Sequence, residues 1–78
     1  GDEVMPRIEF HEFKVMQKGR NRWGDTFIKF DEGHGTDYFT FEPREVQRFS
    51  DDLRRVRRGS RVKIGIDVDT GQYTSIGL

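Results

Sequence analysis

Residues 41–73, FEPREVQRFSDDLRRVRRGSRVKIGIDVDTGQY, change their hydrophobic period halfway along, and this change decides the fold. In the first half, apolar residues recur at the helical spacings of three, four and three, at Val46, Phe49, Leu53 and Val56. Pro43 suits the first helical position because its fixed φ fits a helix, and Gly59 is placed to end the helix in a left-handed cap. In the second half, residues 60–69 alternate between apolar and polar side chains. The stretch therefore predicts one helix followed by one strand with a single buried face.

Four further segments alternate in the same way and are predicted to be strands, at residues 8–17, 26–31, 37–42 and 73–78. In the second of them, Ile28 and Phe30 share the face that should be buried. In the third, Phe39 and Phe41 are expected to point inward, with Tyr38 and Thr40 outward. Turns rich in Gly and Asp separate the strands, so each is bounded by chain-reversing residues.

The first strand changes its parity, since its apolar residues fall on two alternating sets, Ile8 and Phe10, then Phe13 and Val15. One extra residue in a strand reverses which face is buried. The sequence therefore predicts a bulge or sharp bend near His11 and Glu12.

The resulting order of elements is β-β-β-α-β-β, within one domain of 78 residues. Residues 1–6 are expected to be a flexible N-terminus. Five short antiparallel strands can bury one face only by curling, and an amphipathic helix can then cover the open end. We therefore expect a mainly β fold, a small five-stranded OB-like barrel with one helix between strands three and four.

The entry into the fourth strand, residues 57–64 with the sequence RRGSRVKI, resembles that of OB-fold single-stranded nucleic-acid-binding proteins. Both the single-stranded DNA-binding proteins and the S1-like type look similar here. The resemblance covers most of the chain as architecture, and it implies a fold more than a function. Residues 39–53, FTFEPREVQRFSDDL, show a weaker resemblance to the PC4-like and PUR-type single-strand binders, whose sheet precedes the helix.

A basic loop, residues 18–25 with the sequence KGRNRWGD, holds the only tryptophan of the chain. In OB folds the loops between strands one and two and between strands four and five flank a binding face on strands two and three. That face would carry Phe27, Lys29 and Tyr38, and Tyr73 would lie at the second loop. Aromatic side chains that stack bases and cations that follow the phosphates are what single-strand binding requires.

The candidate site therefore has two kinds of residue. The aromatic candidates for stacking are Trp23, Phe27 and Tyr38, with Tyr73 beside them, and the phosphate-contacting candidates are Lys14, Lys18, Arg20, Arg22, Lys29 and Lys63. Two alternatives stay open at this point. Trp23 and Phe27 can instead cover the barrel as core, or the same aromatic residues can form a protein–protein interface.

The four arginines at the end of the helix, Arg54, Arg55, Arg57 and Arg58, favour a solvated helix face over a phosphate patch. Cations in the last turn complement the helix dipole, and pairs of Asp51 with Arg55 and of Arg48 with Asp52 are expected at i,i+4. A supplementary phosphate contact is the second interpretation of these arginines.

Several classes of function lack their motifs. The chain has no cysteine, so it can form neither a disulfide nor a thiolate metal site, and two isolated histidines, His11 and His34, make a weak metal site. The sequence from Asp67 to Gly71 is explained better by a hairpin turn than by a calcium loop. No nucleophile elbow or phosphate-binding glycine loop is present, so we expect a protein that is not an enzyme and uses no cofactor.

The bulk composition sets limits on partners. Fourteen Lys and Arg balance fourteen Asp and Glu, so only a local patch can attract a polyanion. Apolar runs are too short for a membrane span, and a cytoplasmic location is expected. The predicted function is binding of single-stranded nucleic acid, DNA ahead of RNA, with little sequence preference. The alternative is a protein-interaction or homodimerising module that uses the same exposed aromatic and basic surface.

Overall fold

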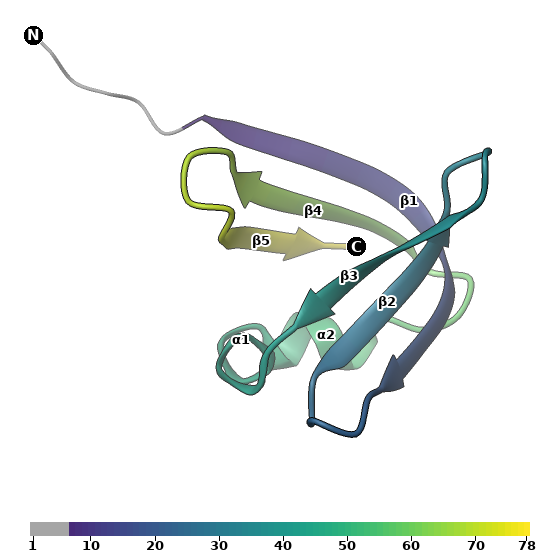
Figure 1. The fold of residues 1–78 in the computed structure, drawn as a ribbon, viewed down its shortest axis with the longest axis horizontal. Coiled ribbons are helices and arrows are strands. Elements are labelled where there is room, and N and C mark those ends of the chain that lie inside the picture. Colours follow the sequence, from purple (N-terminus) through teal and green to yellow (C-terminus); the bar gives the residue numbers. More distant parts are fainter. Residues whose placement is uncertain (1–6) are drawn as a thin grey trace, which may run out of the picture.

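The computed structural model describes residues 7–78, which form five strands and two short helices (Figure 1). The expectation of a flexible N-terminus at residues 1–6 falls outside the described part. The elements are β1 Ile8–Arg20, β2 Thr26–Asp31, β3 Thr36–Phe41, α1 Pro43–Arg48, α2 Ser50–Arg55, β4 Arg61–Asp67 and β5 Tyr73–Gly77. The fold is mainly β, as the alternating segments predict.

All five strands belong to one antiparallel sheet with the order β3-β2-β1-β4-β5. Strand β1 is the longest, with 13 residues, and it pairs with different strands along its length. Its first half lies beside β4, with Lys14 opposite Arg61, and its second half lies beside β2, with Gly19 opposite Phe27. Figure 1 shows β1 bending along the molecule with the two hairpins on either side of it.

The sheet is curled but does not close into a barrel, which corrects the expected architecture. Strands β3 and β5 are its two edges, and no ladder of strand pairing joins them. The ring of Tyr73 on β5 stacks on Phe41 of β3 with 4.2 Å between ring centroids, and its phenol donates a hydrogen bond to the carbonyl oxygen of Thr40 at 2.9 Å. Side-chain contacts therefore span the gap where backbone pairing would close a barrel.

The core lies inside the curl, between the sheet and the helices. Its buried hydrophobic residues come from every strand and from the helical segment, and they are Phe13, Val15, Ile28, Phe30, Phe41, Phe49, Leu53, Val56, Val62, Ile64 and Ile76. Three phenylalanines stack on one another, with centroid distances of 4.4 Å for Phe13 and Phe30, 5.0 Å for Phe30 and Phe39, and 5.4 Å for Phe13 and Phe39. The predicted inward faces of β2 and β3 are confirmed. That of β4 is confirmed as far as Ile66, whereas Val68, predicted on the same face, lies beyond the strand and is 48% exposed.

The prediction for β1 was wrong in two respects. Phe10 is 56% exposed on the outer face, because the inward set of the first half of β1 contains His11, Phe13 and Val15. The pairing with β4 runs without interruption from Ile8 to Lys14, so no bulge lies at His11 and Glu12. The register shift falls between Val15 and Gln17, where β1 passes from β4 to β2.

The single predicted helix is divided at Phe49, whose φ of −108° and ψ of 25° depart from helical geometry. The buried Phe49 ring thereby reaches the core, while its carbonyl accepts a hydrogen bond from Leu53 N at 2.9 Å. Glu42 and Glu45 form a capping box at the start of α1. The second helix ends at Arg55, with Val56 as its C-cap. Gly59, with φ of +90°, instead belongs to the following turn, where its N–H donates to Val15 O.

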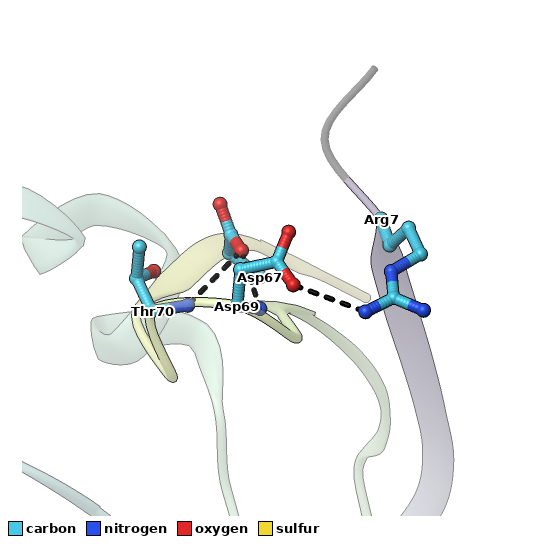
Figure 2. Close-up of polar contacts among 4 residues, drawn as sticks. All are labelled: Arg7, Asp67, Asp69 and Thr70. Carbon is cyan, nitrogen blue, oxygen red and sulfur yellow. Dashed lines mark hydrogen bonds and ion pairs between the residues drawn. The ribbon is translucent and has the colours of Figure 1, made fainter. Parts of the chain in front are cut away.

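The turn between β4 and β5 is a hairpin turn, as predicted. The Oδ1 of Asp67 accepts hydrogen bonds from the backbone N–H of Asp69 at 2.9 Å and of Thr70 at 3.2 Å (Figure 2). The carboxylate of Asp69 pairs with Arg7 at 3.1 Å, so the carboxylates of Asp67 and Asp69 do not converge on one position where a cation could bind. Among residues 7–78 no group of three or more His, Cys, Asp or Glu could hold a metal ion.

On helix α2 the ion pair is Arg54 with Asp51 at 2.6 Å, in place of the expected i,i+4 pairs of Asp51 with Arg55 and of Arg48 with Asp52. The guanidinium of Arg48 lies 5.1 Å from the ring centroid of Phe49 instead. Each described helix has only six residues, and none of them is long and apolar enough to cross a membrane.

Candidate nucleic-acid interface

The basic loop between β1 and β2 is ordered by the side chain of Asn21. Its Oδ1 accepts hydrogen bonds from the backbone N–H of Trp23 and of Asp25, both at 3.0 Å, and its Nδ2 donates to Asp25 Oδ2 at 3.1 Å. The backbone of Asn21 adds bonds to Asp25 and to Gly24, and Gly24 adopts φ of +86°. Such side-chain-to-backbone bonds fix a tight turn. The loop between β1 and β2 is therefore a tight turn held by hydrogen bonds.

Trp23 projects from this connection and is 68% exposed. The guanidinium carbon of Arg22 lies 4.6 Å from the centroid of its ring, within the range of a cation–π contact. The exposure contradicts the alternative in which Trp23 covers the barrel. A large aromatic ring is instead presented to solvent beside a fixed positive charge.

The outer face of β2 and β3 carries the second group of aromatic residues. Phe27 and Lys29 lie on the outer side of β2, opposite Thr40 and Tyr38 of β3. The rings of Phe27 and Tyr38 meet edge to face at 5.9 Å, and Lys29 Nζ lies 5.8 Å from the Tyr38 ring centroid. Tyr38 is 51% exposed, and Phe27 is half-buried. The face thus combines one accessible ring, one supporting ring and one cation.

Phe27 is half-buried because it lies over a glycine. Gly19 is its direct partner on β1, and a Cβ atom at Gly19 would come within 2.6 Å of the Phe27 Cζ. The missing side chain lets the ring settle against the backbone of β1. The packing interpretation therefore describes Phe27 in part, whereas it does not describe Trp23.

The structure separates Lys18 from the rest of the predicted phosphate contacts. Its Nζ donates a hydrogen bond to the carbonyl oxygen of Leu53 near the end of α2. Burial and the nearby positive charge of Arg57 lower the pKa of Lys18 below its usual value. Lys18 lines a cleft of about 450 Å³ together with Thr26 and Arg54. Arg20, exposed at the end of β1, borders the same cleft.

Tyr73 is likewise drawn into the fold, since it spans the gap between β5 and β3. Burial, followed by the charge of Glu45, raises the pKa of its phenol to about 12, against the opposing effect of the bond to Thr40. Lys14 and Lys63 lie together on another surface, the outer face of β1 and β4, where Lys14 is opposite Arg61 and Lys63 is opposite Glu12.

The two loops named by the sequence do approach each other. Asp25 from the first loop and Gly71 and Gln72 from the second line one depression of about 660 Å³, together with Thr40 at the end of β3. Its charged lining is mixed, with Glu42, Arg44, Glu45 and Arg48. The depression therefore borders the aromatic face without being strongly basic itself.

Sequence reasoning missed the residues that position the aromatic rings. Asn21 fixes the Trp23 loop and Gly19 seats Phe27, yet neither was a candidate. The signal for Asn21 was present, because Asn followed by Gly-Asp within four residues is typical of a side-chain-stabilised turn. Gly19 carries no such signal, since its role depends on the register of β1 against β2.

No family model matches the chain, and no curated protein or solved structure matches it at a significant level. The interpretation of this surface therefore rests on its geometry and chemistry.

Proposed function

We propose that the protein binds single-stranded nucleic acid, DNA ahead of RNA, with little sequence preference. The observation that carries the proposal is the ordered loop that holds Trp23 out to solvent with Arg22 against its ring. Every base has a flat π-face, so an exposed aromatic ring binds bases with little regard to their identity. An adjacent guanidinium supplies the phosphate contact.

The outer face of β2 and β3 supplies the second part of the same site. Tyr38 offers an exposed ring with Lys29 beside it, and Phe27 supports that ring from the neighbouring strand. Stacking contributes about 1–3 kcal/mol per base. Two such platforms, at Trp23 and Tyr38, therefore suffice for measurable binding when Arg20, Arg22 and Lys29 contact the phosphates.

We also propose that the fold is OB-like, with an open seam. The sheet order, the long bent β1 shared by both halves and the helical segment between β3 and β4 support this proposal. The depression between the two loops borders the end of β3, as the binding face of such a fold requires.

The neutral net charge favours a second candidate function, a protein-interaction or homodimerising module. Exposed Trp, Tyr and Arg side chains also dominate the binding energy of protein interfaces. The two functions differ in their response to salt. Phosphate contacts to a single strand lower log K by about 0.7 per contact for each unit of log salt concentration, whereas an apolar interface responds little.

The test is a titration of oligo-dT and oligo-U against the protein, followed by Trp23 fluorescence at several salt concentrations. We expect both oligonucleotides to quench Trp23 fluorescence, with tighter binding of oligo-dT. The logarithm of the binding constant should fall linearly with the logarithm of the salt concentration. For Trp23→Ala, anisotropy of a labelled oligonucleotide should show an affinity loss of about 1–3 kcal/mol. The control is Leu78→Ala, because Leu78 is 59% exposed and lies outside the proposed site. Fluorescence that ignores both oligonucleotides contradicts the proposal and directs the search to a protein partner.

A further inference from the structure

A second basic surface lies on the outer face of β1 and β4. Four cations border it: Lys14 on β1, Arg58 in the turn before β4, and Arg61 and Lys63 on β4. Two carboxylates lie among them, Glu12 and Asp31, and Glu12 is already paired with Arg61 at 3.2 Å. Cations therefore outnumber carboxylates on this part of the surface, whereas Phe10 at its far end also borders a third carboxylate, Glu32.

This surface repeats the arrangement found at Trp23 and Tyr38. Phe10 is 56% exposed, and Lys63 Nζ lies 4.8 Å from its ring centroid. Phe10 also lies opposite a glycine, Gly65, in the same way that Phe27 lies opposite Gly19. A Cβ atom at Gly65 would come within 3.1 Å of the Phe10 ring. An exposed ring with a cation beside it thus occurs three times on the outer surface.

Strand β1 connects the two surfaces directly. Its outer residues run from Gly19, beneath Phe27, to Lys14 and then to Phe10. At about 3.3 Å per residue, the nine steps from Gly19 to Phe10 span about 30 Å along the strand. The register shift between them leaves Met16 and Gln17 both exposed, so the path crosses β1 over two exposed side chains.

We propose that the outer face of β1 and β4 is a second subsite, which takes the continuation of a bound single strand after it crosses β1 near Met16. Lys14, Arg58 and Lys63 would contact its phosphates and Phe10 would stack one base. The inference rests on the proposed function, because it extends the same ligand beyond the Trp23 loop. It predicts that long oligonucleotides bind more tightly than short ones, within the range of about 4–16 nucleotides typical of one OB-fold domain.

The experiment compares labelled oligo-dT of about 4 and about 12 nucleotides at low salt, by anisotropy. The variant is Lys14→Gln/Lys63→Gln, which removes two exposed cations. We expect about a tenfold loss of affinity for the long oligonucleotide and a salt slope smaller by about 1.4, twice the value for one contact. Affinity for the short oligonucleotide should stay unchanged, and circular dichroism should confirm the fold.

The matched control is Arg55→Gln/Arg57→Gln, which removes two exposed charges at and just after the end of helix α2 and should leave both affinities unchanged. The single variant Phe10→Ala tests stacking separately and should weaken only the long oligonucleotide. If Lys14→Gln/Lys63→Gln lowers both affinities equally, or neither, the second subsite is wrong while the Trp23 site stands. Failure of the wild-type protein to bind at either length overturns the proposed function itself.

Discussion

The phenol of Tyr73 on β5 donates a hydrogen bond of 2.9 Å to the carbonyl oxygen of Thr40 on β3, across the gap between the two edge strands. The two strands share no backbone ladder, so this bond and the stacking of Tyr73 on Phe41 hold the seam. The side chain of Tyr73 thus joins β5 to β3, whereas neighbouring strands elsewhere in the sheet are joined by backbone pairing.

Replacing Tyr73 with Phe should weaken the seam without removing its ring. The loss of one hydrogen bond is expected to lower the free energy of unfolding by about 1 kcal/mol. Urea unfolding of the two proteins measures the difference. Thr40→Ala is a suitable control, because it keeps the backbone carbonyl that accepts the bond. A Tyr73→Phe protein as stable as the wild type would show that the bond contributes nothing.

Burial of the same phenol makes stability depend on alkaline pH. The pKa of Tyr73 rises from 10.0 to about 12 on folding, so the folded state binds its proton more tightly than the unfolded state. Between pH 10 and pH 12 the unfolded chain binds fewer protons, so the stabilisation is complete below pH 10 and is lost as pH rises toward 12. Tyr73→Phe has no such proton, so its stability should decline less over this interval. Parallel decline of both proteins would contradict the assignment.

Asn21→Ala should release the Trp23 loop. Three hydrogen bonds of the Asn21 side chain are lost, and two of them hold the backbone N–H groups of Trp23 and Asp25. We expect a more mobile tryptophan, seen as lower fluorescence anisotropy, and several-fold weaker oligonucleotide binding because ordering the loop then opposes binding. His34→Ala alters the exposed turn between β2 and β3 and should change neither. Unaltered anisotropy would show that Asn21 does not order the loop.

Gly19→Ala should displace the ring of Phe27, since the new Cβ would lie 2.6 Å from Phe27 Cζ. Overpacking of this kind typically costs about 1–3 kcal/mol of stability. Binding should weaken as well, because Tyr38 loses its edge-to-face support. Gly77→Ala is the matched control, as its Cβ would meet its nearest neighbour at an ordinary 3.9 Å. Chemical shifts of the Phe27 ring and the oligonucleotide affinity report the two effects separately.

Lys18→Met and Lys29→Met should differ in their effect on salt dependence. The ammonium of Lys18 is engaged with the Leu53 carbonyl, whereas that of Lys29 lies on the outer face beside Tyr38. We expect Lys29→Met to reduce the salt slope of oligonucleotide binding by about 0.7 and Lys18→Met to leave it unchanged. An equal reduction in both variants would place Lys18 among the phosphate contacts after all.

The pattern of burial along β2, β3 and β4 was predictable because their side chains alternate cleanly. The exposure of Phe10 was not predictable, because the sequence alone does not distinguish an apolar residue on the outer face of a strand from one on the inner face. The register shift near Met16 was also hidden, because Met16 and Gln17 are both exposed and neither reveals a face. Local pattern identifies a strand, but its neighbours decide which side is covered.

The helical segment and the candidate site show the same limit. The spacing of Val46, Phe49 and Leu53 fits one continuous helix, and the break at Phe49 follows from how its ring reaches the core. Composition identifies the basic loop and its tryptophan, but it leaves open whether Trp23 is exposed or packed. The inward direction of Lys18 depends on Leu53, which is 35 positions away in the chain, and no local pattern contains that contact.

The double pairing of β1 also has a consequence for how the chain folds. Gly19 and Phe27 are eight positions apart, whereas Lys14 and Arg61 are 47 apart. Closing the longer loop costs about 1.5 kcal/mol more in chain entropy. Pairs of high sequence separation form slowly, so we expect the meander of β1, β2 and β3 to form first. Until β4 pairs with it, the first half of β1 is an unpaired edge of the partly folded sheet. In this intermediate the chain is most able to pair with another copy of itself.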